Sequence, residues 1–166
     1  MVRSKKEKQL GQVCDMCKTS SILESLLVVY EYHNPIVERI IYSMKYRGAY
    51  DIARTMGEIM AQEISSCIDL DGGQHIVIPM PLHGARERER GFNQSEVLAK
   101  VLSRRWGLDC ERRSLIRIKN TDHQARLAPH ERISNIRGAF AVKNQESVRG
   151  RSVLLVDDVC TTGATL

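Results

Sequence analysis

The strongest constraint on this chain is residues 153–165, which run Val-Leu-Leu-Val-Asp-Asp-Val-Cys-Thr-Thr-Gly-Ala-Thr. The four apolar residues predict a fully buried strand of a parallel sheet. Asp157 and Asp158 then lie at the carboxyl end of that strand, where open α/β sheets bind their ligands. The loop that follows offers hydroxyls and backbone N–H groups to a phosphate. The segment therefore predicts an α/β protein that binds a phosphorylated sugar; the alternative is a strand followed by an Asp-rich turn.

This segment resembles the phosphoribosyl-pyrophosphate (PRPP) motif of type I phosphoribosyltransferases over its whole length. The resemblance implies an α/β fold in which helices flank an open parallel sheet. It also implies that Asp157 and Asp158 are the catalytic pair and hold the ribose 2′- and 3′-hydroxyls, with Mg²⁺ bound alongside PRPP. The implied 5′-phosphate loop comprises Cys160, Thr161, Thr162, Gly163, Ala164 and Thr165, in which Cys160 is a spacer rather than a nucleophile.

Further blocks resemble, in their order along the chain, the ComF family of competence proteins, also called GntX-like. The likeness covers roughly residues 28–166 and implies a role in DNA uptake or utilisation. The blocks are Met44-Lys45-Tyr46-Arg47-Gly48, Pro79-Met80-Pro81-Leu82-His83, Arg90-Gly91-Phe92-Asn93-Gln94, Glu131-Arg132 and Gly138-Ala139-Phe140, together with Arg86, Arg88, Gln124, Leu127 and Asn135.

The loop after the first core strand binds pyrophosphate in type I phosphoribosyltransferases. The resemblance places Leu82, His83 and Arg86 in that loop, and Arg90 beside it. Guanidinium groups suit this role because they grip phosphate oxygens in bidentate fashion. The alternative is an exposed helical face on which these arginines alternate with glutamates. His83 is a candidate phosphate ligand or general acid, and an ordinary structural histidine is the alternative.

Residues 119–137 match the part that forms a mobile lid over the site in these enzymes, with Gln124 and Arg132 as candidate contacts; a solvated loop is the alternative. A catalytic chain of this class would transfer the phosphoribosyl group and release pyrophosphate. The residues leave open whether the chain is catalytic, and none of them declares the acceptor.

Strands that alternate with helices predict a mainly parallel sheet. An N-cap residue followed by proline, Asn34-Pro35, begins the first expected helix, and Gly48 ends it. Its apolar positions at helical spacing are Ile36, Val37, Ile40, Ile41 and Met44. The other expected helices cover about 51–66, 94–105 and 129–136. The expected strands are the second half of 22–32, then 75–82, 115–118, 139–142 and 152–156.

The five cysteines do not predict a disulfide framework, since no secretory signal precedes them, and we expect a cytoplasmic protein. Cys14 and Cys17 have the spacing of zinc-binding thiolates. A structural zinc needs four ligands, however, and the chain has no second Cys-x-x-Cys, so zinc binding is in doubt. Cys67 and Cys110 are expected to be buried apolar fillers.

Charge is concentrated in residues 83–137, which hold 13 basic and seven acidic residues. This excess favours an anionic partner, and a solvated face is the alternative. A second hypothesis is therefore a non-catalytic protein that handles single-stranded DNA with the same fold. Its weakness is that aromatic residues make up only 5% of the chain.

A phosphate loop of this kind normally opens a helix, whereas the chain stops at Leu166. We therefore expect a chain that is cut at both ends relative to its family. Residues 1–20 would be the remnant of a cysteine-bearing, zinc-ribbon-like segment. Residues 21–166 would be a phosphoribosyltransferase-like domain that lacks its C-terminal part.

Overall fold

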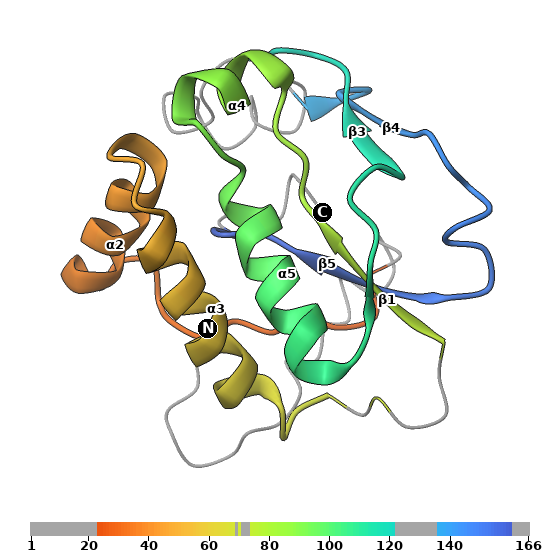
Figure 1. Cartoon of the computed structure of the whole chain (residues 1–166), viewed down its shortest axis with the longest axis horizontal. Helices are drawn as coiled ribbons and strands as arrows, with labels where there is room; N and C mark the ends of the chain where they lie inside the picture. Colours follow the sequence, from red (N-terminus) through yellow and green to blue (C-terminus); the bar gives the residue numbers. More distant parts are fainter. Residues whose placement is uncertain (1–22, 69, 71–73, 122–135, 161–166) are drawn as a thin grey trace.

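The computed structural model describes residues 23–68, 70, 74–121 and 136–160. Its helices are α2 (Pro35–Tyr46), α3 (Tyr50–Ile64), α4 (Gly84–Arg90) and α5 (Gln94–Trp106). Its strands are β1 (His75–Pro79), β2 (Asp109–Cys110), β3 (Leu115–Arg117), β4 (Phe140–Val142) and β5 (Ser152–Val156). These elements form an open α/β structure in which helices flank a parallel sheet, as the sequence predicts (Figure 1).

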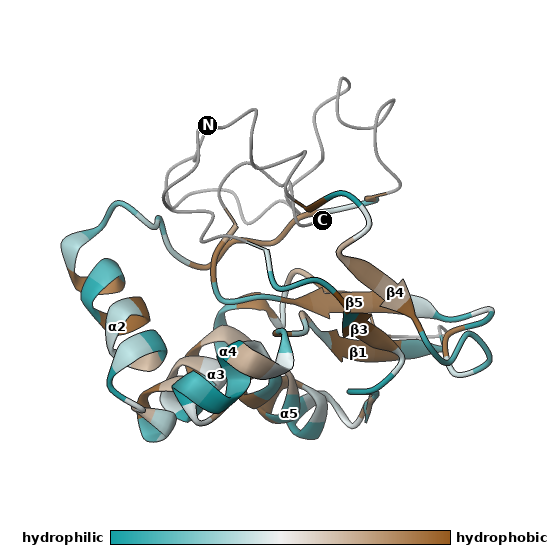
Figure 2. Ribbon diagram, turned by 90° about the horizontal axis from the view of Figure 1, so that it is seen from above, coloured by the Kyte–Doolittle hydropathy of each residue, from teal (hydrophilic) through white to brown (hydrophobic). Residues whose placement is uncertain are grey.

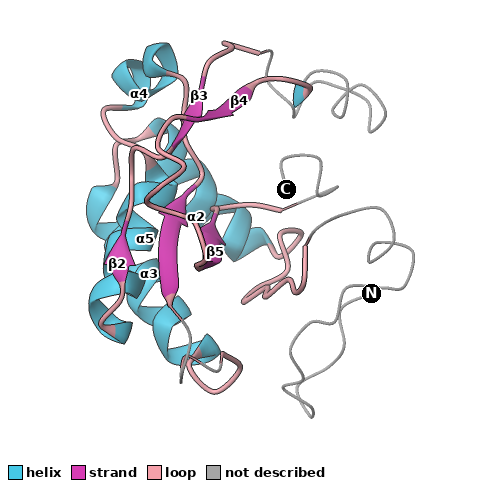
Figure 3. Ribbon diagram, turned by 90° about the vertical axis from the view of Figure 1, so that its right-hand side faces the viewer, coloured by secondary structure: helices cyan, strands magenta, loops and turns pink. Residues whose placement is uncertain are grey.

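The central sheet has the strand order β2-β1-β5, and both of its strand pairs are parallel (Figure 3). β1 and β5 pair from His75 opposite Ser152 to Pro79 opposite Val156. One more bond, from Met80 N to Val156 O at 2.8 Å, extends the pairing past the strand ends. Because parallel strands end at the same edge, the loop after β1 and the acidic pair after β5 are neighbours.

The described helices lie on one side of the strands (Figure 2). α5 packs on the sheet, and α3 packs on α5. The core between these layers is fully buried and includes Ala61, Val77, Leu98, Leu102 and Val156. α3 approaches α5 so closely that a Cβ on Gly57 would lie 2.8 Å from Val101 Cβ. A side chain at position 57 would therefore push the two helices apart.

The first helix begins as its sequence predicts. Asn34 Oδ1 accepts a hydrogen bond of 2.9 Å from Ile36 N, and Pro35 occupies the first helical position. Ile41 and Met44 are buried, whereas Ile36 is 69% exposed and contributes nothing to the core. The buried face of the helix is therefore narrower than the spacing of its apolar residues predicts. No helix in the described ranges has both the length and the apolar character to cross a bilayer.

Three expectations about strands are wrong. Residues 27–32 form bends and a turn instead of a strand, and Val28 is 59% exposed, because they have no strand partner in the described chain. β5 is not fully buried: it has one described neighbour, and Val153 is 46% exposed. β3 and β4 pair antiparallel in a separate two-stranded sheet rather than joining the parallel one.

The remaining expected elements are confirmed to within a few residues, and the short strand β2 was not predicted. α4 corresponds to the alternative offered for Arg86 and Arg90: it is a helix on which arginines alternate with glutamates, and none of its residues is buried. Of the helix expected over 129–136, only Ile136 lies within the described residues; it is helical and 7% exposed. Residues 129–135 lie outside the described chain.

Candidate functional site

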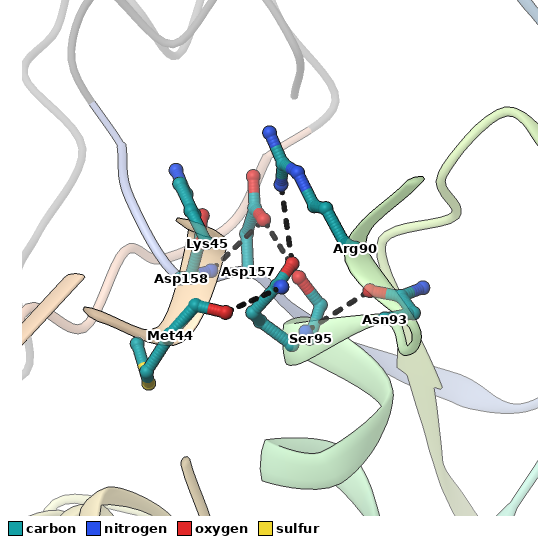
Figure 4. Close-up of polar contacts among 8 residues, drawn as sticks. Met44, Lys45, Arg90, Asn93, Ser95, Asp157 and Asp158 are labelled. Carbon is teal, nitrogen blue, oxygen red and sulfur yellow. Dashed lines mark hydrogen bonds and ion pairs between the residues drawn. The ribbon is translucent and has the colours of Figure 1, made fainter. Parts of the chain in front are cut away.

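The acidic pair lies directly after β5 and is held by contacts from two other elements (Figure 4). Asp157 Oδ1 accepts a hydrogen bond from Ser95 Oγ at 2.9 Å and another from the backbone N of Asp158 at 2.9 Å. Asp158 Oδ2 lies 3.0 Å from Lys45 Nζ, and the Asp158 side chain is only 9% exposed. The two carboxylates therefore point in fixed directions before any ligand arrives.

Burial is the main influence on the ionisation of Asp157. Burial first, and then the neighbouring charge of Asp158, raise the pKa of this carboxyl from 3.8 to about 6. The hydrogen bonds from Ser95 and from the backbone, and the charge of Lys45, oppose the rise. The site therefore holds a carboxylate at a free-energy cost, which is common where a protein binds a ligand.

Three buried polar residues at the start of α5 tie the site together. Asn93 Oδ1 caps the helix by accepting from Ser95 N at 3.1 Å, and Asn93 Nδ2 donates to Met80 O at 3.0 Å. Gln94, 1% exposed, donates from Nε2 to Met44 O at 2.9 Å. The start of α5 thus connects the end of α2, the loop after β1 and the acidic pair. The sequence signal for this role is the run of polar residues Asn93-Gln94-Ser95 at a predicted helix start. If such residues become buried, each must find a hydrogen-bond partner, so the run is a candidate for contacts to other elements.

Arginines from separate elements gather near the acidic pair. Arg90, at the end of α4, donates to Gln94 Oε1 at 3.2 Å, a contact drawn in Figure 4. Burial lowers the pKa of Arg117 on β3, the charges of Arg86 and Arg90 lower it further, and Asp157 raises it. No described residue accepts a hydrogen bond from Arg117 Nε. This set of like charges is suited to an anion.

The loop after β1 provides the other wall of the site. Leu82 and His83 follow β1 and are partly buried. His83 is the N-cap of α4, and its Nδ1 accepts a hydrogen bond of 3.3 Å from Ala85 N. This capping contact accounts for one ring nitrogen and leaves Nε2 for another partner.

Comparison with known proteins agrees with this geometry. The family model described as "Phosphoribosyl transferase domain" matches residues 89–166. Competence protein ComFC of Bacillus subtilis (strain 168) is 30% identical, and the match covers 99% of this chain and 72% of that protein. Competence protein F of Haemophilus influenzae is 28% identical over 94% of this chain and 69% of its own length. This chain belongs to the ComF family.

Other ComF relatives include DNA utilization protein YhgH of Escherichia coli (strain K12), which is 30% identical over 86% of this chain and 63% of its own length. No solved structure matches the chain.

Within this ComF chain, the structure brings together the acidic pair, the loop after β1, Arg86 and Arg90. It adds Lys45, Ser95 and Arg117, which sequence reasoning did not assign to the site. Lys45 lies in the block Met44–Gly48 that resembles the family, so a signal for it existed. Arg117 had no signal, since it is one of several basic residues between Arg112 and Lys119 and no motif includes it. Lys45 also balances one of the two negative charges of the acidic pair.

Several predicted residues lie outside the described chain. They are Cys14, Cys17, Gln124, Arg132, Thr161, Thr162, Gly163, Ala164 and Thr165. Cys160 is described and exposed, while Cys67 and Cys110 are only partly buried. Burial raises the pKa of the Cys110 thiol, which agrees with a packing role.

The acidic pair is better suited to Mg²⁺ that binds together with a ligand than to a structural metal ion held by protein side chains alone. Among the described residues, no group of three or more His, Cys, Asp or Glu side chains could hold a metal ion. Mg²⁺ does not need one, because in phosphate-handling sites it is bound by one or two carboxylates together with substrate phosphates. Asp157 and Asp158 provide that donor set.

A separate surface cavity of about 420 Å³ does not include the acidic pair. Its lining includes Asp109, Glu111, Glu146 and Arg151. Arg151 already pairs with Asp109 at 3.0 Å. Three carboxylates around one paired guanidinium repel a phosphorylated ligand, so this cavity is not a candidate for the phosphate site.

Proposed function

We propose that this chain binds PRPP, or a related ribose 5-phosphate compound, at the edge of the sheet where β1 and β5 end. The observation that carries the proposal is the position of Asp157 and Asp158 beside the loop after β1. Arg90 bonds Gln94, the chain neighbour of the Ser95 that holds Asp157, and Arg117 is close enough to interact with the charges of Asp157, Arg86 and Arg90. Carboxylates accept hydrogen bonds from ribose hydroxyls, and guanidiniums bind phosphate oxygens. One site thus offers both kinds of group that a phosphorylated ribose requires.

The chemistry that follows is phosphoribosyl transfer. In this reaction the bond between the anomeric carbon and the pyrophosphate oxygen breaks, pyrophosphate leaves with the electron pair, and an acceptor forms the new bond. Asp157 and Asp158 orient the ribose, while the arginines hold the pyrophosphate oxygens where negative charge develops. Mg²⁺, held by the acidic pair together with the ligand's phosphates, would neutralise part of that charge.

We further propose that this site acts in DNA uptake or utilisation. The support is the family itself, because relatives over most of the chain are called competence proteins and DNA utilization proteins.

Isothermal titration calorimetry with PRPP and Mg²⁺ tests the binding step. Replacing Asp157 or Asp158 with Asn removes one charged acceptor, and the affinity should fall about 10- to 150-fold per carboxylate. Asp51→Asn is the matched control, because Asp51 is an exposed carboxylate on α3, with a side chain that is 90% exposed, and it should bind like the wild type. A PRPP affinity equal to that of the wild type in all three variants would contradict the proposed site. Release of pyrophosphate, measured on the same preparations with candidate acceptors, tests the transfer step.

A further inference from the structure

Lys45 is mostly buried, although aromatic neighbours on the same helix are exposed. Its side chain is 22% exposed, whereas Tyr42 and Tyr46 on α2 are 54% and 55% exposed. A lysine is rarely withdrawn from water unless its charge is paired. The partner here is Asp158, whose Oδ2 lies 3.0 Å from Lys45 Nζ and whose side chain is 9% exposed (Figure 4). The helix therefore directs a charged side chain, rather than an aromatic ring, toward the acidic pair.

The backbone on each side of this ion pair is held by packing. Met44, the chain neighbour of Lys45, is 1% exposed, and its backbone O accepts a hydrogen bond of 2.9 Å from Gln94 Nε2. Val159, the chain neighbour of Asp158, packs against the buried cluster that includes Met44. The core therefore sets the distance between the end of α2 and the end of β5, and the ion pair forms across a separation that is already fixed.

The value of this contact lies in direction more than in stability. Removing two charges from water costs about as much free energy as their attraction returns, so an ion pair at this depth adds little to the stability of the fold. It does fix a carboxylate: Oδ2 of Asp158 is held by Lys45, as Oδ1 of Asp157 is held by Ser95 Oγ at 2.9 Å. No hydrogen bond between described residues uses the other oxygen of either carboxylate. Each carboxylate therefore has one oxygen bound by the protein and one available to a ligand.

We propose that Lys45 is a positioning residue of the ribose site: it holds Oδ2 of Asp158 so that Oδ1 is directed at a ribose hydroxyl of the ligand. This inference rests on the proposed function, because it assigns Lys45 a role in the same site. Lys45 acts through Asp158 and does not itself bind the ligand's phosphates, which are held by the arginines of α4 and β3. Its charge also reduces the repulsion between the acidic pair and an anionic ligand, although only as one charge among several.

Isothermal titration calorimetry on the full 166-residue chain tests the inference with two probes, PRPP and inorganic pyrophosphate, each with Mg²⁺. Lys45→Met keeps the length of the side chain and removes its charge. Its PRPP affinity should fall at least about tenfold, as for the loss of a hydrogen bond to a charged group. Pyrophosphate has no ribose, so its affinity should fall by no more than about threefold, which is the effect of removing one screened charge. Lys100→Met is the matched control, because Lys100 pairs with Glu96 at 2.7 Å on α5, and this variant should bind both probes like the wild type.

A second comparison does not require Lys45→Met to fold with an unpaired Asp158. It uses Asp158→Asn and the double variant Lys45→Met with Asp158→Asn, in which both charges of the ion pair are gone. Once Asp158 is replaced, Lys45 has nothing left to position. The two variants should therefore bind PRPP within about threefold of each other, the allowance again being one screened charge.

Three results would overturn the inference and leave the proposed function standing, because the wild type binds PRPP in each of them. One is a loss of PRPP affinity in Lys45→Met that is smaller than about tenfold. Another is an equal loss of PRPP and pyrophosphate affinity, which would make Lys45 a phosphate ligand. The third is a double variant that binds PRPP more than about threefold more weakly than Asp158→Asn, since Lys45 would then act without Asp158. A wild type that binds neither PRPP nor ribose 5-phosphate contradicts the proposed function, and the inference falls with it.

Discussion

Replacing Asp157 with Asn should stabilise the folded protein at neutral pH. Burial raises the pKa of Asp157 from 3.8 to about 6, so the folded state holds an ionised carboxylate at a cost above that pH. Each pKa unit corresponds to about 1.4 kcal/mol, which gives a cost of up to about 3 kcal/mol at pH 8. Asn avoids this cost and keeps an Oδ1 that accepts from Ser95 Oγ and from the backbone of Asp158.

The gain should depend on pH in a defined direction. A carboxyl with a raised pKa in the folded state contributes stability that is fully present below about pH 4 and is lost as the pH rises through about 6. The free energy of unfolding of Asp157→Asn should therefore exceed that of the wild type at pH 8 and approach it at pH 4.5. Urea denaturation at several pH values between 4.5 and 8 measures this difference directly.

Two further measurements make the test specific. Asp51→Asn removes an exposed carboxylate and should change the free energy of unfolding by less than about 0.5 kcal/mol at any of these pH values. Asp157→Asn should lose PRPP affinity while it gains stability, as expected where a binding site is built at a cost to the fold. A difference from the wild type that is the same at pH 4.5 and pH 8, or no gain at pH 8, would refute the reasoning.

Two predictions concern the framework around the site. Gly57→Ala should lower the free energy of unfolding by about 1–3 kcal/mol, because the new Cβ would lie 2.8 Å from Val101 Cβ. An unchanged free energy of unfolding in chemical denaturation would mean that α3 and α5 can move apart at little cost in stability. Asn93→Ala should cost about 1–3 kcal/mol, since it removes the cap of α5 and the donor to Met80 O. Asn34→Ala, which removes only a cap at an exposed position, should cost less in the same assay, and an equal or larger loss there would contradict the role of the Met80 contact.

Much of the local structure follows from residues close together in the chain. Asn34-Pro35 predicts the start of α2, and the apolar run before Asp157 predicts β5 and the position of the acidic pair at its end. These features are predictable because they depend on interactions among residues only a few positions apart: an N-cap with the second helical residue, or a strand with the turn that ends it. The resemblance to the ComF family rests on the same kind of local block.

The parts that only the tertiary structure decided involve residues far apart in the chain. Lys45 on α2, Ser95 on α5 and Arg117 on β3 meet the acidic pair only after the helices pack on the sheet. The block around Lys45 resembles the family, but it does not show which group Lys45 contacts, because its partner lies more than a hundred residues away. The exposure of Tyr42 and Tyr46 was likewise undecided, since the same spacing would serve a buried face. Sequence alone determined which groups are available to the proposed ribose-phosphate site. Packing decided which of them share a site, because burial and distance are properties of the whole folded chain.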